Sequence, residues 1–136
     1  MRLAILLAAA ATAGAKSMMA SVPEWTIEWM VRTCNGADTS CNWSFSIDTH
    51  TGNPTACQFT VTGSAASHAP ANGVHCGVYT VSSGWSGQFG PGNGFTTLSV
   101  VDYTQKLIVW PAYTDKQLAN GVVVTPDQSY APATLG

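Results

Sequence analysis

Four cysteines, Cys34, Cys41, Cys57 and Cys76, have the most definite chemistry in this 136-residue sequence. An even number of cysteines predicts two disulfides when the chain is exported to an oxidising compartment, and four cysteines allow three pairings. Sequence alone does not separate the three, but spacing favours one. Cys34 and Cys41 flank the turn-rich segment Asn-Gly-Ala-Asp-Thr-Ser, whereas Cys57 and Cys76 each open a β-like run. A Cys57–Cys76 bond would join neighbouring strands across the loop between them.

A metal site is the competing use for these side chains, because His68 and His75 lie close to Cys76. Structural zinc sites usually take paired CxxC or HxxxH spacings, and the sequence contains neither. We expect no metal and no cofactor. His50, His68 and His75 lie in loop-like segments, where we expect them to be solvated.

Two short segments are similar to catalytic motifs without matching them. Gly84-Trp85-Ser86-Gly87-Gln88 departs from the nucleophile elbow at its last position, and no helix is predicted after it. Gly90-Pro91-Gly92-Asn93-Gly94 lacks the Gly-Lys-Ser/Thr ending of a phosphate loop, and its proline removes a backbone donor. Neither a serine hydrolase nor a nucleotide-binding protein is predicted.

A glycosidase would need two carboxylates facing one cleft. Four of the five aspartates are the candidates, and all four lie beside turn residues, where Asp commonly bonds local backbone amides. They are Asp48, Asp102, Asp115 and Asp127. Since no pair stands out, we expect that the protein is not an enzyme.

Four other residues could act at the surface. Asn42-Trp43-Ser44 is an acceptor sequon for N-glycosylation, and strand alternation predicts that Asn42 points outward. Trp85 and Phe89 lie in a glycine-rich segment with no alternating strand to bury them, and Gln88 lies between them. These aromatics could stack on sugar rings or anchor a partner protein, or they could fold over one end of the protein and close its core.

The N-terminal segment predicts export. Met1-Arg2 is a short basic start, Leu3–Ala13 is a run of apolar and small residues, and Ala13-Gly14-Ala15 is a small-x-small cleavage site. We predict that residues 1–15 are a cleaved signal peptide, with Ala20 as a second possible site, and that residues 16–136 form one secreted domain. The apolar run is shorter than the roughly 20 residues that span a bilayer, so no membrane insertion is expected.

Charge is scarce throughout the chain, and only 9% of the residues are charged. After the leader, the cations are Lys16, Arg32, Lys106 and Lys116, and they do not cluster. Because binding to a phosphate backbone requires clustered Lys and Arg, nucleic acid is not an expected partner.

Alternating apolar and polar residues predict the β-strands that position the cysteines and the candidate surface residues. Over residues 25–32, Trp25, Ile27, Trp29 and Val31 are expected to face the core, and residues 41–48 alternate more regularly still. A long loop is predicted over 63–75, and only 115–120 has a helical pattern. Further strands are predicted over 58–62, 77–81, 95–103, 106–110 and 122–125. The fold is therefore an all-β, compact antiparallel barrel or sandwich of about seven to nine strands.

Several segments also carry a family resemblance. They are Glu24–Ile27, Cys41–Asp48, Cys57–Val61, Cys76, Ser86–Pro91, Leu107–Asp115 and Gln128–Pro132. The chain resembles the fungal family of the major Alternaria allergen and, more closely, the related hypersensitive-response-inducing protein elicitors of plant-pathogenic fungi. The resemblance covers nearly all of the chain after the leader.

This resemblance implies a secreted β-barrel that elicits plant immunity through surface recognition by a plant cell-surface or apoplastic protein. The Cys57–Cys76 bond matches one in the allergen. The early cysteine of the allergen's covalent dimer is missing between Lys16 and Thr33, so a monomer is expected. The alternative hypothesis is a cell-wall carbohydrate-binding module that uses Trp85 and Phe89 as a stacking platform.

Overall fold

The computed structural model describes residues 22–136. The predicted signal peptide, residues 1–15, lies outside them. Within the described residues the main elements are β1 (Trp25–Cys34), β2 (Ser40–Asp48), β3 (Thr55–Thr62), β4 (Ala71–Cys76), β5 (Tyr79–Ser86), β6 (Phe95–Asp102), β7 (Leu107–Val109), β8 (Ala112–Thr114), α2 (Asp115–Leu118), β9 (Gln128–Tyr130) and β10 (Ala133–Thr134). The short 3₁₀ turns η2 (Ala66–His68) and η3 (Ala119–Gly121) follow β3 and α2. No helix in residues 22–136 is long and apolar enough to span a membrane.

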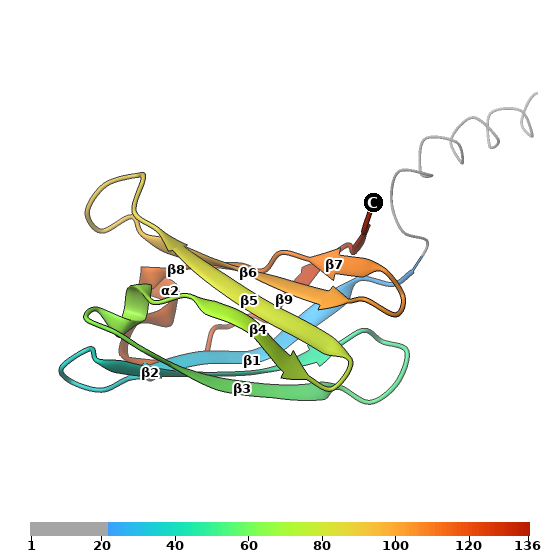
Figure 1. The fold of residues 1–136 in the computed structure, drawn as a ribbon, viewed down its shortest axis with the longest axis horizontal. Coiled ribbons are helices and arrows are strands. Elements are labelled where there is room, and N and C mark those ends of the chain that lie inside the picture. Colours follow the sequence, from blue (N-terminus) through green and yellow to red (C-terminus); the bar gives the residue numbers. More distant parts are fainter. Residues whose placement is uncertain (1–21) are drawn as a thin grey trace, which may run out of the picture.

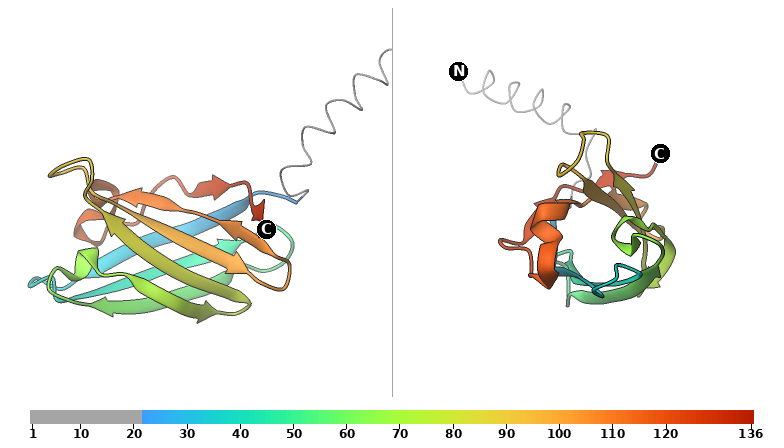
Figure 2. Two further views of the ribbon diagram at one scale, coloured as in Figure 1. Left: turned by 45° about the horizontal axis from the view of Figure 1, so that its top comes forward. Right: turned by 90° about the vertical axis from the view of Figure 1, so that its left-hand side faces the viewer.

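The strands form two antiparallel sheets that face each other. The four-stranded sheet has the order β3-β2-β1-β9, and the six-stranded sheet has the order β10-β7-β6-β5-β4 with β8 paired to β6. Both sheets curve around a shared core, so the end-on view has a rounded outline (Figures 1 and 2). The all-β prediction is confirmed, and the two sheets do not join into one closed barrel.

Strand β2 shows why alternation predicted this fold. Its inward residues Cys41, Trp43, Phe45 and Ile47 are all buried, as expected for a strand with one solvated face. Trp43 stacks on Phe59 of β3 with ring centroids 6.2 Å apart. Most of the core therefore consists of large apolar side chains from alternate positions.

Strand β1 departs from the prediction after Glu28. The register with β2 shifts between Glu28 and Val31, and Trp29 adopts a left-handed φ of 59°. A bulge adds one residue to a strand and exchanges the faces of those that follow. Trp29 is therefore 68% exposed instead of buried, while Met30 and Arg32 face the core.

Several other segments also differ from the prediction. The predicted loop over 63–75 contains most of β4, and the predicted strand over 122–125 is irregular. Its one ladder-like bond joins Val124 N–H to the carbonyl of Met30 (2.8 Å). The short strands β8, β9 and β10 were not predicted.

The structure contains the Cys34–Cys41 and Cys57–Cys76 disulfides, the pairing that spacing favours. Cys34 lies directly opposite Cys41 in the β1–β2 ladder, so this bond connects strands that are already paired. Cys57 lies in β3 and Cys76 in β4, so the second bond joins the two sheets.

Candidate recognition surface

Several connections gather at one end of the molecule, which we call the helix end. It carries η2, α2 and the β5–β6 loop, residues 87–94 (Figure 2). Trp85 lies just before this loop, and both Gln88 and Phe89 lie within it. The predicted recognition residues therefore share one end of the sandwich.

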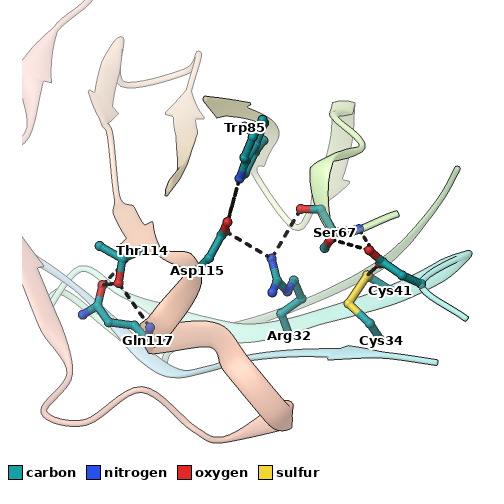
Figure 3. Close-up of polar contacts among 9 residues, drawn as sticks. Arg32, Cys34, Cys41, Ser67, Trp85, Thr114, Asp115 and Gln117 are labelled. Atoms are coloured by element: carbon teal, nitrogen blue, oxygen red, sulfur yellow. Dashed lines mark hydrogen bonds and ion pairs between the residues drawn. A yellow bond between two sulfur atoms is a disulfide. The ribbon is translucent and has the colours of Figure 1, made fainter. Parts of the chain in front are cut away.

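Trp85 is half-buried and held on two sides. Its indole N–H donates to the Asp115 carboxylate, at 3.0 and 3.2 Å from the two oxygens (Figure 3). The His68 imidazole stacks on the indole with ring centroids 3.6 Å apart and an interplanar angle of 7°. Trp85 therefore links β5 to α2 and η2, and His68, which was expected to be simply solvated, has a packing partner.

Two glycines let the loop backbone lie against this indole. A Cβ added to Gly87 would lie 2.5 Å from Cη2 of Trp85, and one added to Gly94 would lie 2.7 Å from Cζ2. Real Cβ atoms essentially never approach so closely, so a side chain at either position would displace Trp85 or the loop. With His68 on its face and two glycines against its ring, Trp85 does not form an open stacking platform with Phe89.

Arg32 extends the contacts of Asp115 into the core. Its Nη1 atom lies 3.8 Å from Oδ1 of Asp115 and donates to the carbonyl of Ser67 at 3.3 Å. Its guanidinium carbon lies 5.8 Å from the centroid of the Trp43 ring, within the range of a cation–π contact. We call the group Arg32, Ser67, His68, Trp85 and Asp115 the polar clasp.

Local sequence explains the position of Asp115. Thr114 is the N-cap of α2 and forms a capping box with Gln117, whose N–H donates to the Thr114 hydroxyl at 3.1 Å. Asp115 is the first helical residue, where a negative side chain interacts favourably with the helix dipole. A short capped turn therefore fixes the carboxylate that both Trp85 and Arg32 contact.

Asp38 joins the β1–β2 hairpin to η2. Its carboxylate accepts the Ser67 N–H at 2.8 Å and the Ser67 hydroxyl at 2.7 Å. These hydrogen bonds lower the pKa of Asp38. Asp38 also lies near Cys34 and Cys41, with possible ligand atoms within 4.8 Å of one another, but both sulfurs are in a disulfide and offer no thiolate to a metal.

Phe89 is exposed where Trp85 is not. It is 65% exposed and stacks on Phe95 of β6, with ring centroids 5.7 Å apart. The loop is held by Asn93, whose side-chain amide donates to the carbonyl of Phe89 at 3.2 Å. The backbone N–H of Gln88 donates to the Ser86 hydroxyl at 3.3 Å. Phe89 is thus presented on an internally bonded loop.

An apolar cavity of about 340 Å³ adjoins Phe89. Phe95, Ala112 and Tyr113 form much of its wall, and Asn93 and Thr114 complete it. Tyr113 is buried, and burial raises the pKa of its hydroxyl. The cavity and the exposed ring can together receive an apolar side chain.

Asn42 lies on the outer face of β2, as the alternation predicts. Its side-chain amide donates to the Thr60 hydroxyl at 3.2 Å, and its carbonyl accepts from Gln58 at 3.3 Å. Both partners belong to β3. Glycosylation of Asn42 stays a prediction.

Asp48 and Asp102 bond local amides as expected. Asp48 accepts the His50 N–H at 2.8 Å, and Asp102 accepts those of Thr104 and Gln105 at 3.0 and 3.1 Å. By contrast, Asp127 accepts the distant Trp29 N–H at 3.1 Å.

Sequence reasoning did not single out Glu28, Arg32 or the role of Asp115. Removal from water and the neighbouring Asp48 carboxylate raise the pKa of Glu28. Strand alternation would have suggested that Glu28 and Asp48 share the outer face of β1 and β2, but the position of Arg32 depended on the bulge. In the sequence Asp115 stood out only as one of four aspartates beside turn residues, and the capping box of α2 is the local signal that could have placed it at the start of a helix.

Comparison with known proteins identifies the family. The family model described as Effector TSP1 matches residues 26–135. Effector TSP1 of Hypocrea virens (strain Gv29-8 / FGSC 10586) is 58% identical over 128 residues, which cover 93% of this chain and 87% of that protein. These matches support a fungal effector, while the relationship to the major Alternaria allergen stays a prediction. The chain belongs to the Effector TSP1 family.

Proposed function

We propose that this effector is secreted and triggers plant defence when a plant cell-surface or apoplastic protein binds its Phe89 surface. We define the Phe89 surface as Gln88, Phe89, Asn93 and Phe95 with the adjoining cavity. The observation that carries the proposal is the exposed Phe89 ring on a hydrogen-bonded loop beside an apolar cavity. Aromatic residues, phenylalanine among them, are enriched at protein interfaces.

The construction of the loop supports binding at low entropic cost. Gly90 N–H donates to the carbonyl of Gly87 at 3.0 Å, and Asn93 N–H donates to that of Gly90 at 3.1 Å. The polar clasp holds Trp85 at the start of the loop. Because a partner would meet a loop already close to one conformation, less conformational entropy is lost on association.

Secretion and a monomeric state are part of the same proposal. The basic, apolar and small-residue pattern of residues 1–15 supports export. All four cysteines are in intrachain disulfides, which are typical of oxidising compartments and leave no thiol for a covalent dimer. In this proposal the protein acts by being bound and not by catalysis.

The test is a dose series of purified protein without residues 1–15, infiltrated into leaves. Ion leakage and the oxidative burst are measured for wild type, Phe89→Ala and the control Tyr103→Ala. Tyr103 is 63% exposed and lies in the β6–β7 turn, away from the Phe89 surface. We expect Phe89→Ala to require at least about a tenfold higher dose, equivalent to about 1.4 kcal/mol, and Tyr103→Ala to match wild type.

Circular dichroism and a melting curve establish that each sample is folded. A folded wild type that causes neither cell death nor an oxidative burst contradicts the proposed function. Equal potency of Phe89→Ala and wild type would place recognition on another surface.

A further inference from the structure

The outer face of the six-stranded sheet carries a second possible binding site. A shallow trough of about 200 Å³ crosses β4, β5 and β6, which lie side by side (Figure 1). The residues that carry the argument are Asn72, Ser82, Gly84, Thr97, Ser99 and Trp110. We call this feature the trough. It contains none of the residues of the Phe89 surface.

Strand register explains how the trough is built. Ser82 pairs with Ser99, and Gly84 pairs with Thr97. Trp110 lies between β7 and β8, both of which pair with β6, and it is 53% exposed. The floor is therefore a row of small hydroxyl side chains across the strands, with a large aromatic ring at one end.

Gly84 keeps this floor open, although the fold does not require a glycine there. Its φ is not positive, and a Cβ added to it would meet nothing within 4 Å. Gly87 and Gly94, by contrast, are needed against Trp85. Glycine weakens the interior of a strand and often marks a place where a ligand approaches the backbone closely.

The polar groups of the trough are neutral. Its lining residues include serine, threonine and asparagine and no charged side chain. The Ser82 hydroxyl accepts the Gly73 N–H at 3.0 Å, which orients its oxygen and leaves its proton free to be donated. Hydroxyl and amide groups can both donate and accept hydrogen bonds, as sugar hydroxyls also do. An aromatic face beside them can cover the apolar face of a pyranose ring.

We propose that the trough binds a neutral polysaccharide, with a sugar ring stacked on Trp110 and its neighbour lying over Gly84. The absence of charge in the lining argues against anionic polymers such as pectate. Neutral polysaccharides occur in plant walls as cellulose and in fungal walls as chitin and β-glucan. The experiment must therefore separate these sources.

The full secreted chain is incubated with cellulose, β-1,3-glucan, chitin or polygalacturonate, and the bound fraction is measured over a range of protein concentrations. The variants are Trp110→Ala, which removes the ring, and Gly84→Ile, which fills the trough with a side chain that strands favour. Trp29→Ala is the control, because Trp29 is also an exposed tryptophan but belongs to the other sheet. We expect saturable retention on at least one neutral polymer, with at least a tenfold weaker affinity for Trp110→Ala and Gly84→Ile and no change for Trp29→Ala.

Retention of wild type on polygalacturonate alone, or on no polymer, overturns the proposal. Equal retention of wild type, Trp110→Ala and Gly84→Ile also overturns it. Because Gly84→Ile adds a favourable strand residue in open space, its melting temperature should not fall below that of wild type, and a loss of binding then reflects the site. Phe89→Ala should bind the polymer normally, so failure of the leaf assay and failure of this assay are distinguishable.

Discussion

Two different links hold the four-stranded and six-stranded sheets together. The Cys57–Cys76 bond joins β3 to β4 covalently, whereas in the polar clasp Arg32 of β1 reaches Trp85 of β5 through Asp115. The disulfide lowers the conformational entropy of the unfolded chain, and this effect does not depend on the detailed geometry of the folded state. The clasp stabilises only a folded arrangement in which its side chains meet. The disulfide should therefore govern stability, and the clasp should govern the shape of the helix end.

The largest effect is expected from the double variant Cys57→Ala/Cys76→Ala. The bonded cysteines are 19 residues apart, and the chain-entropy model gives a loss of about 3.3 kcal/mol in the free energy of unfolding. Urea unfolding followed by tryptophan fluorescence measures the loss. An unchanged unfolding midpoint would show that the sheets do not depend on this bond.

A smaller loss is expected for Cys34→Ala/Cys41→Ala. These cysteines are 7 residues apart, for which the same model gives about 2.5 kcal/mol, and the β1–β2 ladder continues to hold the two strands together. Unfolding of both double variants under identical conditions compares the two bonds directly. A greater loss for Cys34→Ala/Cys41→Ala would reverse the comparison.

Asp115→Asn tests the contribution of the polar clasp while leaving both disulfides intact. The variant keeps an acceptor for the Trp85 N–H but leaves the buried guanidinium of Arg32 without its anion. Losing one partner of a fully buried pair costs about 3–5 kcal/mol, but Asp115 is partly exposed, so we expect about 1–2 kcal/mol. Because the clasp supports the Phe89 loop, Asp115→Asn should also lower potency in the leaf assay. The dose needed should rise even under conditions in which the variant remains folded.

The control is Lys116→Gln, which changes an exposed neighbour in the same short helix. Unfolding and leaf assays on the two variants test whether the clasp has this local role. If Asp115→Asn retains full potency in leaves, the clasp does not position the loop.

The smallest effect concerns Asp38, whose hydrogen bonds to Ser67 lower its pKa. A lowered pKa stabilises the folded state above the unfolded value of about 3.9, and this contribution is lost as pH falls through the folded pKa. Between about pH 4 and pH 2, wild type should therefore lose more stability than Asp38→Asn. Melting temperatures of wild type and Asp38→Asn, measured at several pH values, give the difference. If the two melting temperatures change with pH in the same way, Asp38 does not contribute to the loss of stability in acid.

The sequence predicted the elements whose signals are local. Residues 41–48 alternate regularly, and the structure has the expected strand β2 with its inward face buried. The turn between Cys34 and Cys41 also pointed to the observed hairpin. In β1 the same reasoning failed after Glu28, because a bulge depends on how one strand meets its neighbours and not on apolar periodicity.

The amino-acid sequence by itself determined an all-strand fold and two favoured disulfides, since alternation and cysteine spacing act over short distances along the chain. Only the tertiary structure decided that Trp85 is half-buried and held by neighbouring elements, while Phe89, four residues later, stays exposed. That difference depends on Arg32, His68 and Asp115, which lie far from Trp85 in the sequence. The burial of an aromatic residue is a property of its spatial neighbours, which become known only when the sheets have packed.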